Sequence, residues 1–343
     1  MNSMERIGAL LSGSPVDRPP YTMTLSLYGA RLLGVSTQSY YTDPDLYAQG
    51  QQAVIDLCAP DIVFSPFALS LEVAPYGVLL NFPENGPPYL KKPAFRSIRD
   101  FSIKKAPEID DSPELSYLIR ATEKLATLQK GSRPVAAPIL APVDIPILLI
   151  GIDAWLEVLL FKPEDAKTLS EIALEHFINL AKVYAKAGAA FLVTPVTFAN
   201  TALVNPEISR EILIPLLKEG FSQLEIPIVF HHGGNRLADT IELYRDLPNL
   251  LGFVLDERDS FDEARKRIGP DFILMGNLNG PYMPFRSISD IIERTKRLLE
   301  NRKTDGKFVF ATSGADIPFD TEPDTLAALR DVFVSPSGVS ENA

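Results

Sequence analysis

Two adjacent histidines, His231 and His232, end a short apolar run in the stretch IPIVFHHGGN (226–235). An imidazole can ligate a metal ion or move a proton near neutral pH, so a histidine at a strand end is a candidate catalytic group. The alternative is a hydrogen-bonded residue that only ends the strand. Because successive side chains of a strand point to opposite faces, we expect His231 to face the interior and His232 to point away.

Polar side chains also stand at or after the ends of other apolar runs. Carboxylates and amides in such places can coordinate a divalent ion, or bind a polar substrate and move a proton. The candidates are Glu72 after the run 61–65, Thr197 and Asn200 after 189–195, Asn235 after 226–231, Asp256 at the end of 250–256, Asn277 and Asn279 at and after the end of 271–277, and Asp316 after 307–313.

Several of these residues also have a structural interpretation. Asp256 can cap the next helix, and Asp316 can shape a turn. Glu72 interrupts an apolar stretch, which suits a surface loop as well as a site. We interpret Asp259 as a solvated loop charge, and His176, in the middle of a predicted helix, as structural.

The elements that must position these residues are short apolar runs that alternate with amphipathic stretches. Near-continuous apolar strands between helices indicate a parallel sheet buried on both faces. Eight runs predict strands, at 21–27, 61–65, 134–141, 189–195, 226–231, 250–256, 271–277 and 307–313. They favour an α/β fold of the (β/α)8 TIM-barrel type, whose strand ends converge on one rim. The alternative is an open doubly wound sheet, but no glycine-rich phosphate motif follows any run.

Helices are predicted between the strands. Residues 163–188 begin with Pro163 and two acids and end at Gly188, the usual asymmetry of a helix. Further helical patterns cover 209–224, 237–247, 260–269 and 288–302.

The chain shows no linker that would divide it. We interpret residues 1–335 as a single domain, with the segment 1–19 packed against the barrel. The polar segment 87–107 is interpreted as an excursion between strands, and 336–343 as a disordered tail.

The composition excludes several classes of partner and location. With 33 Lys and Arg against 44 Asp and Glu, the chain lacks the basic surface that nucleic acid requires. The single cysteine, Cys58, excludes an internal disulfide and fits a reducing cytoplasm. Residues 1–11 lack a secretion signal, and Asp153 and Glu157 interrupt the apolar stretch 146–161, so we expect a soluble cytoplasmic protein without a membrane span.

Seven stretches, taken in their order and spacing, resemble one known family. They are MERIGALLSGSPVDRPP (4–20), YYTDPDLYAQGQQAVIDLCAPDIV (40–63), GPPYLKKPAF (86–95), FHHGGN (230–235), GFVLDE (252–257), FILMGNLNGPYM (272–283) and FATSGADIPFDTEPDTLAAL (310–329). The chain resembles the uroporphyrinogen decarboxylase superfamily, and within it the corrinoid-dependent methyltransferases that include methylcobamide:coenzyme M methyltransferases. This resemblance implies a (β/α)8 barrel, in agreement with the strand count.

Two departures from the family pattern bear on activity. Decarboxylases of the family carry an arginine-rich segment after the first strand, where this chain has LSLYGARLLG with Arg31 alone, so uroporphyrinogen decarboxylation is not expected. The coenzyme M methyltransferases bind zinc through a histidine and two cysteines. His231 matches the histidine, whereas Gly233 and Ala315 stand where the cysteines would be, so a thiolate-rich zinc site is not expected.

The resemblance, with these cysteines replaced, implies a methyltransferase that moves a methyl group from a small O- or N-methyl donor to the Co(I) corrinoid of a partner protein. Imidazole and carboxylate ligands leave a metal more Lewis-acidic than thiolates do, and thus better suited to polarising an oxygen. The corrinoid is expected on a carrier protein, since the short cobalamin-ligating pattern DxHxxG is absent.

The resemblance also suggests a role for each candidate. The expected acid–base residues are His231, Asp256 and Glu72, and the expected substrate-binding residues are Asn235, Asn277, Asn279 and Thr197. A divalent metal, zinc or another, is expected to use His231 and Asp316, completed by Glu72 or Asp256. The alternatives on the same barrel are a thiol methyltransferase, a decarboxylase-like lyase and a non-catalytic member. The sequence leaves the methyl donor, the metal and the oligomeric state open.

Overall fold

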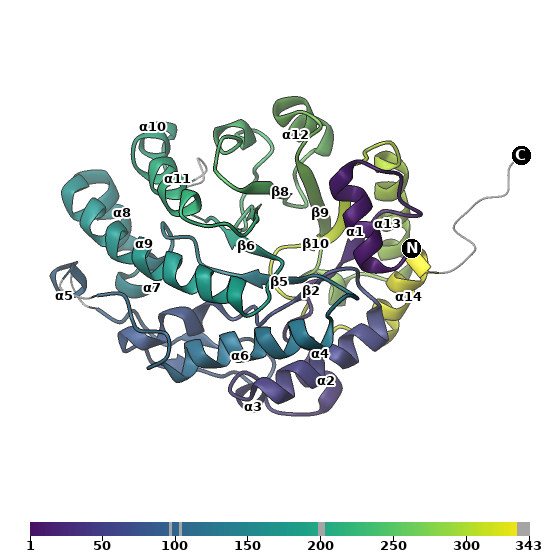
Figure 1. Ribbon diagram of the computed structural model, residues 1–343, viewed down its shortest axis with the longest axis horizontal. Helices are drawn as coiled ribbons and strands as arrows, with labels where there is room; N and C mark the ends of the chain where they lie inside the picture. The colour runs from purple at the N-terminus through teal and green to yellow at the C-terminus, as the bar shows by residue number, and fades with distance from the viewer. Residues whose placement is uncertain (96–97, 103–104, 198–202, 335–343) are drawn as a thin grey trace, which may run out of the picture.

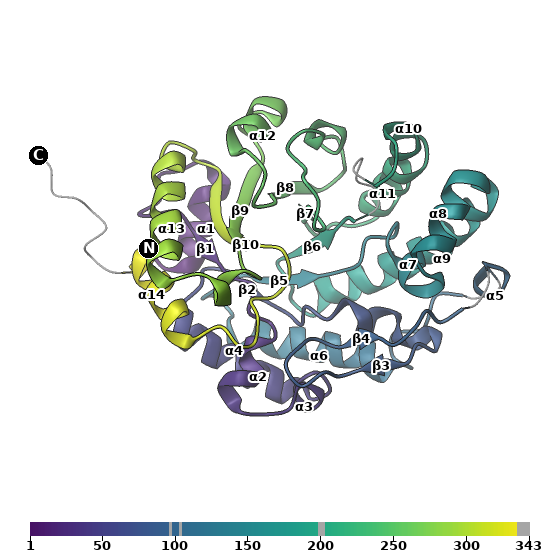
Figure 2. The same ribbon diagram turned by 180° about the vertical axis from the view of Figure 1, so that it is seen from behind.

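A ring of parallel strands with helices around it forms the centre of the molecule (Figures 1 and 2). The structure is a computed structural model that describes residues 1–95, 98–102, 105–197 and 203–334. Asn200 and the predicted tail 336–343 lie outside the described residues. The assignment of 1–335 to a single domain stays a prediction.

The barrel contains eight strands, joined by parallel pairings in the order β1-β10-β9-β8-β7-β6-β5-β2. They are β1 (Tyr21–Thr22), β2 (Val63–Phe64), β5 (Val135–Pro138), β6 (Phe191–Pro195), β7 (Ile228–His231), β8 (Leu250–Val254), β9 (Ile273–Asn279) and β10 (Phe308–Ser313). Each lies within or overlaps a run predicted from the sequence. The nearly closed ring confirms the (β/α)8 TIM barrel, and the open doubly wound sheet is wrong.

Strands β1 and β2 are shorter than predicted, and side-chain carboxylates accept some of the backbone N–H groups there. The N–H of Asp61 donates to the carbonyl of Tyr21 at 2.8 Å, and the N–H of Tyr21 donates to the Asp61 carboxylate at 2.9 Å. Farther along, the N–H of Ser26 donates to the carboxylate of Asp316. These bonds join β1 to β2 and fix the chain beyond β1 without a regular strand ladder.

Helices and short turns of helix cover the outside of the barrel. The α-helices are α1 (Ser3–Ser12), α2 (Tyr28–Leu33), α3 (Thr37–Tyr40), α4 (Pro44–Cys58), α5 (Ile98–Ser102), α6 (Pro113–Leu128), α7 (Ile145–Ile150), α8 (Ile152–Phe161), α9 (Pro163–Lys186), α10 (Pro206–Ile208), α11 (Ile214–Ser222), α12 (Phe261–Ile268), α13 (Ile288–Arg302) and α14 (Pro323–Val334). The shorter turns are η1 (Leu69–Tyr76), η2 (Ser209–Leu213), η3 (Ile241–Leu243) and η4 (Met283–Phe285), and β3 (Leu80–Asn81) pairs with β4 (Tyr89–Leu90) in an antiparallel hairpin.

The longer helices begin where the sequence supplies a cap. The side chains of Asp43, Ser112 and Ser287 accept N–H bonds from the first turns of α4, α6 and α13. Proline occupies the first position of α4 and of α6, where its missing N–H costs nothing. None of the helices in the described ranges is long and apolar enough to cross a bilayer.

The predicted helices at 163–188, 260–269 and 288–302 are confirmed as α9, α12 and α13. The predicted helix at 237–247 is wrong, because that segment forms only the short turn η3. Its first N–H groups, of Leu237 and Ala238, donate to the carboxylate of Asp259 at 3.0 Å instead. A carboxylate from the next loop thus takes the place of a first helical turn.

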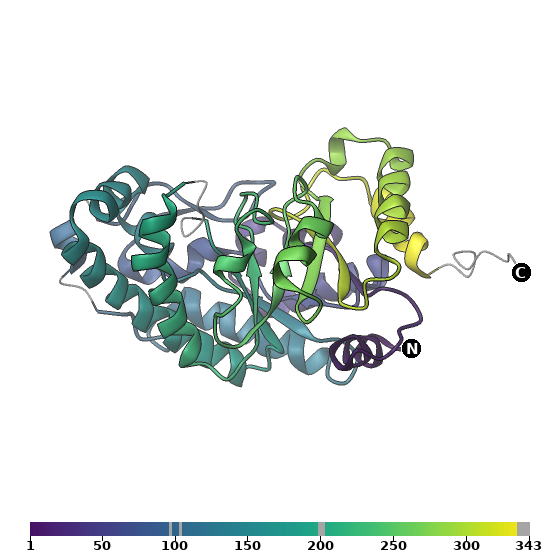
Figure 3. The ribbon, with the colours of Figure 1, turned by 90° about the horizontal axis from the view of Figure 1, so that it is seen from above.

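Two hydrophobic layers lie on the two sides of the sheet. Alternate strand residues, such as Ala136, Val193, Val229 and Met275, fill the barrel interior, and the opposite faces pack on the helices. Leu10 of α1 belongs to the interior cluster. Helix α1 therefore closes one end of the barrel, as predicted for the N-terminal segment, and Figure 3 shows it on one side of the ring.

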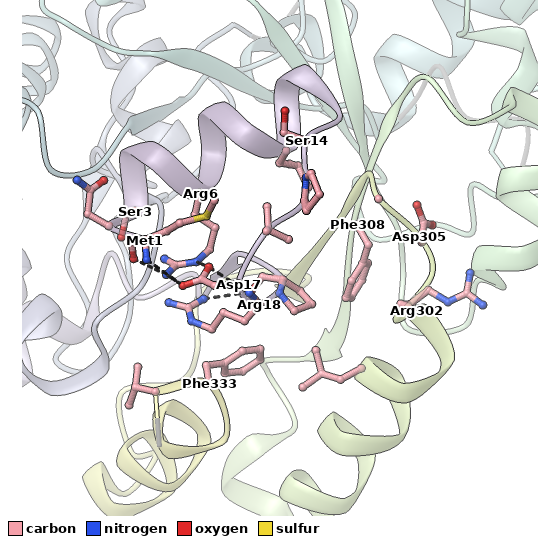
Figure 4. A pocket seen from close by; sticks show the side chains of 18 of the residues that line it. Met1, Ser3, Arg6, Ser14, Asp17, Arg18, Arg302, Asp305, Phe308 and Phe333 are labelled. Atoms are coloured by element: carbon pink, nitrogen blue, oxygen red, sulfur yellow. Dashed lines mark hydrogen bonds and ion pairs between the residues drawn. The ribbon is translucent and has the colours of Figure 1, made fainter. Parts of the chain in front are cut away.

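A buried network of charges fixes α1 to the barrel. Asp61 is fully buried and accepts from the guanidinium groups of Arg6 and Arg18, both at 2.6 Å. Arg6 also pairs with Asp17, which lies near the N-terminal amine (Figure 4). Arg6, Asp17 and Arg18 border a cavity of 1180 Å³ at the N-terminal ends of the strands, opposite to the rim that carries the predicted site.

Candidate functional site

The two histidines lie side by side at the C-terminal end of β7. His231 continues the row of Val229, which faces the barrel interior, so His231 points toward the mouth. However, the ring of His232 stacks on that of His231, with centroids 4.2 Å apart and planes at 25°. The expectation that the two side chains diverge is wrong. Strand β7 ends at His231, and beyond its end the alternation of a strand no longer applies.

Backbone N–H groups hold both rings. Nδ1 of His231 accepts the N–H of Gly233 at 3.1 Å, and Nδ1 of His232 accepts the N–H of Gly234 at 3.0 Å. The N–H of Gly314 after β10 lies 3.2 Å from Nε2 of His232, and because a neutral ring has one acceptor nitrogen, His232 accepts either this N–H or that of Gly234. His232 thus ties two loops of the rim together. In His231 the bond to Nδ1 assigns the hydrogen of the neutral ring to Nε2.

Both rings are neutral at physiological pH. Burial holds the pKa of His231 well below 6.5, and the neighbouring His232 lowers it further, against a smaller opposing effect of the Gly314 backbone. Burial likewise lowers the pKa of His232 to about 4, although the Asp256 carboxylate opposes the shift. His231 can therefore donate a hydrogen bond through its N–H without carrying a charge.

Asp256 lies beside His232, and its surroundings do not suit the role of a general acid. Its carboxylate is 3.4 Å from Nδ1 of His232 and accepts bonds from the backbone and side chain of Arg258. Burial raises the pKa of Asp256, but the bonds from Arg258 and the nearby His232 outweigh it, so that its pKa lies below the usual value. An ionised carboxylate has no proton to give, and this geometry favours a positioning role.

Asp259 is buried, so its interpretation as a solvated charge is wrong. Only 7% of the residue is exposed, and its carboxylate accepts the N–H groups of Leu237 and Ala238 in the loop after β7 and that of Asp256. It holds the loop after β7 against the loop after β8. The sequence offered a signal for this role, since Asp259 follows a strand as Asp256 does.

The four predicted substrate-binding residues use their polar groups to hold loops. The side chain of Asn235 donates to the carbonyl of Thr197 at 3.3 Å, which joins the loops after β7 and β6. Asn277 donates to the carbonyl of Asp256 at 2.9 Å, and Asn279 accepts the N–H of a residue in its own loop. Contacts of these residues with a substrate stay a prediction.

Asp144 is a rim carboxylate that sequence reasoning missed. It follows β5, is buried, and accepts the N–H of Thr197 at 2.7 Å. It thereby connects the loops after β5 and β6. Its position after the run 134–141 could have identified it by the same rule that selected Asp256.

Glu72 lies behind the rim, and its contacts point toward α9. It is 1% exposed, and its carboxylate accepts the N–H of Leu140 at 3.0 Å. Burial raises the pKa of Glu72 well above its usual value, and its charge raises the pKa of Tyr184 in α9. Within the described residues, the contacts of Glu72 do not bring it to the histidine pair.

Asp316 lies on the rim after β10 and faces the loop after β1. One carboxylate oxygen, Oδ1, accepts the N–H of Ser26 at 2.7 Å. Burial raises the pKa of Asp316 to about 7, against the opposing effect of the Ser26 and Leu27 backbone. The residue also borders a cavity of 300 Å³. Its described contacts are therefore with the β1 loop, and the structure does not pair it with His231.

The residues present do not fit a divalent metal. Within the described ranges, no group of three or more His, Cys, Asp or Glu side chains is placed to hold one. Nδ1 of His231 accepts an N–H, whereas a ligating histidine normally donates through its second nitrogen to an acceptor. A Cβ added at Gly233 would lie 2.7 Å from the backbone of Val196, so there is no room for a cysteine side chain at the position where the family has its first cysteine.

Arg31, the single arginine of its segment, uses its side chain for hydrogen bonds within the protein. Its guanidinium donates to the carbonyls of Phe319 and Thr321 and fixes the loop between β10 and α14.

The comparisons with known proteins agree with this architecture. The curated protein "Methylated-thiol–coenzyme M methyltransferase" of Methanosarcina mazei is 22% identical over 308 residues, which cover 87% of this chain and 81% of that protein. A solved structure, a methyltransferase from Methanosarcina mazei, superposes with a TM-score of 0.84 at 22% identity and covers 97% of this chain and 99% of that one.

A putative vitamin-B12-independent methionine synthase from Listeria monocytogenes is more distant. It has a TM-score of 0.51 and 14% identity, over 92% of this chain and 94% of its own. At these identities the solved structures establish the fold alone. The family model described as uroporphyrinogen decarboxylase (URO-D) matches residues 2–334, nearly the whole chain. The protein therefore belongs to the uroporphyrinogen decarboxylase family.

Proposed function

We propose that this protein is a methyltransferase that moves a methyl group from a small O- or N-methyl donor to the Co(I) corrinoid of a carrier protein. Its similarity to a methylated-thiol–coenzyme M methyltransferase over 87% of the chain supports methyl transfer. Gly233 and Ala315 stand where the related methyltransferases have cysteines, and the absence of those thiolates favours an oxygen or nitrogen donor over a thiol. Location in the cytoplasm is part of the same proposal, on the ground of the single cysteine.

The observation that carries this proposal is the bond from the Gly233 N–H to Nδ1 of His231. It places the hydrogen of the neutral, buried ring on Nε2, at the barrel mouth and beside the Gly314 backbone, whose hydrogen bond raises the pKa of His231. When the methyl–oxygen bond breaks, its electron pair stays on the leaving oxygen, which then needs a hydrogen-bond donor. A preorganised N–H in a site with little water stabilises such developing charge without any ionised acid.

Two neighbouring residues of the rim then have supporting roles. His232 and Asp256 hold His231 and the loops around it, through bonds to Gly314 and Arg258. The corrinoid, once bound with its carrier, supplies the nucleophile that takes the methyl group. The chain itself binds and orients the donor and places the His231 N–H at the leaving atom.

The test is a methyl-transfer assay with purified protein, a Co(I) corrinoid carrier and a panel of O-, N- and S-methyl donors, followed through the cobalt spectrum. We expect a spectral change with at least one O- or N-methyl compound. His231→Gln, which can keep an N–H near the position of Nε2, should retain more activity than His231→Asn, which keeps only an atom near Nδ1. A response confined to thioethers, or none with any donor, contradicts the proposal.

A further inference from the structure

The imidazole rings of His231 and His232 stack in the same orientation. Nδ1 of His231 lies 3.1 Å from the N–H of Gly233 in the loop after β7. Nδ1 of His232 lies 3.0 Å from the N–H of Gly234, the next residue of that loop. The ring centroids are 4.2 Å apart and the planes differ by 25°. The two Nδ1 atoms therefore share one edge of the pair, and the two Nε2 atoms share the other.

Gly314, in the loop after β10, contacts the Nε2 edge with both of its backbone groups. Its N–H lies 3.2 Å from Nε2 of His232. Burial lowers the pKa of His231, and a hydrogen bond with the Gly314 backbone opposes this shift. Only an acceptor stabilises a protonated imidazole, so Gly314 acts on His231 through its carbonyl. Because Nδ1 of His231 already accepts the Gly233 N–H, the nitrogen that faces this carbonyl is Nε2.

Two arrangements are open to the neutral ring of His232, and Asp256 distinguishes them. With the hydrogen on Nε2, the ring would turn an N–H toward that of Gly314 and its Nδ1 lone pair toward the ionised Asp256 carboxylate, 3.4 Å away. With the hydrogen on Nδ1, the ring donates to this carboxylate and accepts the Gly314 N–H, but gives up the bond from Gly234. The backbone of Asn235 is a further acceptor for the ring, but it carries no charge. A hydrogen bond to an ionised group is about twice as strong as a neutral one, which favours the hydrogen on Nδ1.

Arg258 and the stacking support the same assignment. Arg258 donates to Oδ1 of Asp256 and to the carbonyl of Gly234, so Oδ2 is the carboxylate oxygen that faces His232. An imidazole dipole points toward the nitrogen that carries the hydrogen. A hydrogen on Nε2 of one ring and on Nδ1 of the other sets the two dipoles in opposite directions. This is the attractive arrangement for two stacked rings of the same orientation.

We propose that Asp256 and Gly314 are positioning residues that hold the stacked histidines in opposite tautomers, with the hydrogen on Nε2 of His231 and on Nδ1 of His232. Asp256 sets the tautomer of His232, which then accepts the N–H of Gly314. The carbonyl of Gly314 in turn orients the N–H of His231. In methyl transfer, the leaving oxygen becomes more negative than a peptide carbonyl and takes over this hydrogen bond as its bond to the methyl group breaks. That last step rests on the proposed function, whereas the tautomers do not.

Nitrogen NMR of protein labelled with 15N-histidine tests the tautomers without a methyl donor or a corrinoid. The chain has three histidines, so the ring signals are few, and the variants His176→Leu and His231→Gln assign them by loss. At pH 8, where both stacked rings are neutral, we expect the protonated nitrogen to be Nε2 in His231 and Nδ1 in His232. The same tautomer in both rings, or a hydrogen on Nε2 of His232, overturns the inference.

Asp256→Asn tests the link from the carboxylate to His232. The new amide can donate to Nδ1 of His232, so the hydrogen should move to Nε2 and the bond from Gly314 should be lost. The methyl-transfer kcat should then fall about tenfold, with little change in the KM of the donor. Glu257→Gln is the matched control, because it removes a charge from the adjacent residue, which pairs with Arg294, and it should change neither the tautomers nor the rate. An unchanged tautomer of His232 in folded Asp256→Asn contradicts the role of Asp256.

Gly314→Ala tests the link through the backbone. Gly314 has φ of 88°, and an added Cβ would lie 3.3 Å from Pro281, so alanine should displace this segment from the rings and lower kcat about tenfold. Gly77→Ala is the control, because Gly77 has φ of 90° with open space around it and donates its N–H to Ala74. Equal rates in the two variants contradict the role of Gly314. Opposite tautomers in a wild-type protein that transfers no methyl group would overturn only the proposed function.

Discussion

The rings of His231 and His232 stack at 4.2 Å, yet their hydrogen bonds differ. His232 has a backbone N–H within bonding distance of each nitrogen, of which its neutral ring can accept one, whereas among the described residues His231 has such an N–H at Nδ1 alone. One ring of the pair is therefore fixed as a tie between loops, and the other keeps its N–H at the barrel mouth.

This difference predicts opposite effects of the two alanine variants. His231→Ala removes the proposed donor and should lower the methyl-transfer rate by about 100-fold or more, with little change in melting temperature. His232→Ala leaves the backbone N–H that the ring accepts, of Gly234 or Gly314, without its acceptor and should cost about 1–3 kcal/mol of stability. Single-turnover rates and thermal melting measure the two effects. A stable His232→Ala variant that has lost activity, beside an active His231→Ala, would reverse the assignment.

Restoring the family cysteines should not restore a zinc site. Gly233 has φ of 62°, and a Cβ there would meet the backbone of Val196 at 2.7 Å, so Gly233→Cys is strained as well as crowded. We expect the double variant Gly233→Cys, Ala315→Cys to lose about 2 kcal/mol or more of stability and to bind less than one equivalent of zinc.

The single variant Ala315→Cys is the control for this prediction, because position 315 carries no positive φ. Urea denaturation measures the stability, and elemental analysis measures the metal. A double variant that is as stable as the control and holds a full equivalent of zinc would show that the loop after β7 can open to admit the thiolate.

His176 should make the protein less stable in acid. It is 1% exposed, and burial lowers its pKa from 6.5 to about 4, although a hydrogen bond with the Glu72 backbone opposes the shift. Because the unfolded chain binds the proton more readily, stability is lost as the pH falls from 6.5 to 4. The difference of these two values corresponds to about 3 kcal/mol as an order of magnitude.

His176→Leu removes this titration and tests it. The variant should be as stable as the wild type at pH 7, or slightly more stable, and should lose less stability on acidification. Denaturation curves at several pH values between 4 and 7 give the comparison. Parallel pH profiles for the two proteins would mean that His176 does not contribute.

The charges around Asp61 predict a large effect from a small change. Asp61→Asn leaves the buried guanidinium group of Arg6 and the half-buried one of Arg18 without their carboxylate, which should cost about 3–5 kcal/mol. Asp17→Asn is the matched control, because 41% of the Asp17 side chain is exposed, and it should cost about 1 kcal/mol or less. Equal losses in the two variants would contradict the assignment of Asp61 as the centre of the network.

The sequence by itself determined the eight strands, the main helices and the placement of His231 at a strand end. These features follow from apolar periodicity, caps and glycine or proline signals, which are properties of neighbouring residues. Even the histidine tautomer depends on a residue only two positions away, although no pattern in the letters reveals it.

Only the tertiary structure decided which polar groups remain available for chemistry. Gly314 reaches His232 across 82 residues, and Ser26 reaches Asp316 across 290. Such bonds engage Asp256, Asp259 and the rim amides, whereas one oxygen of Asp316 has no hydrogen-bond partner among the residues that the structure describes. A buried donor or acceptor binds whichever group the packed fold brings to it, and that choice depends on loops distant in the chain.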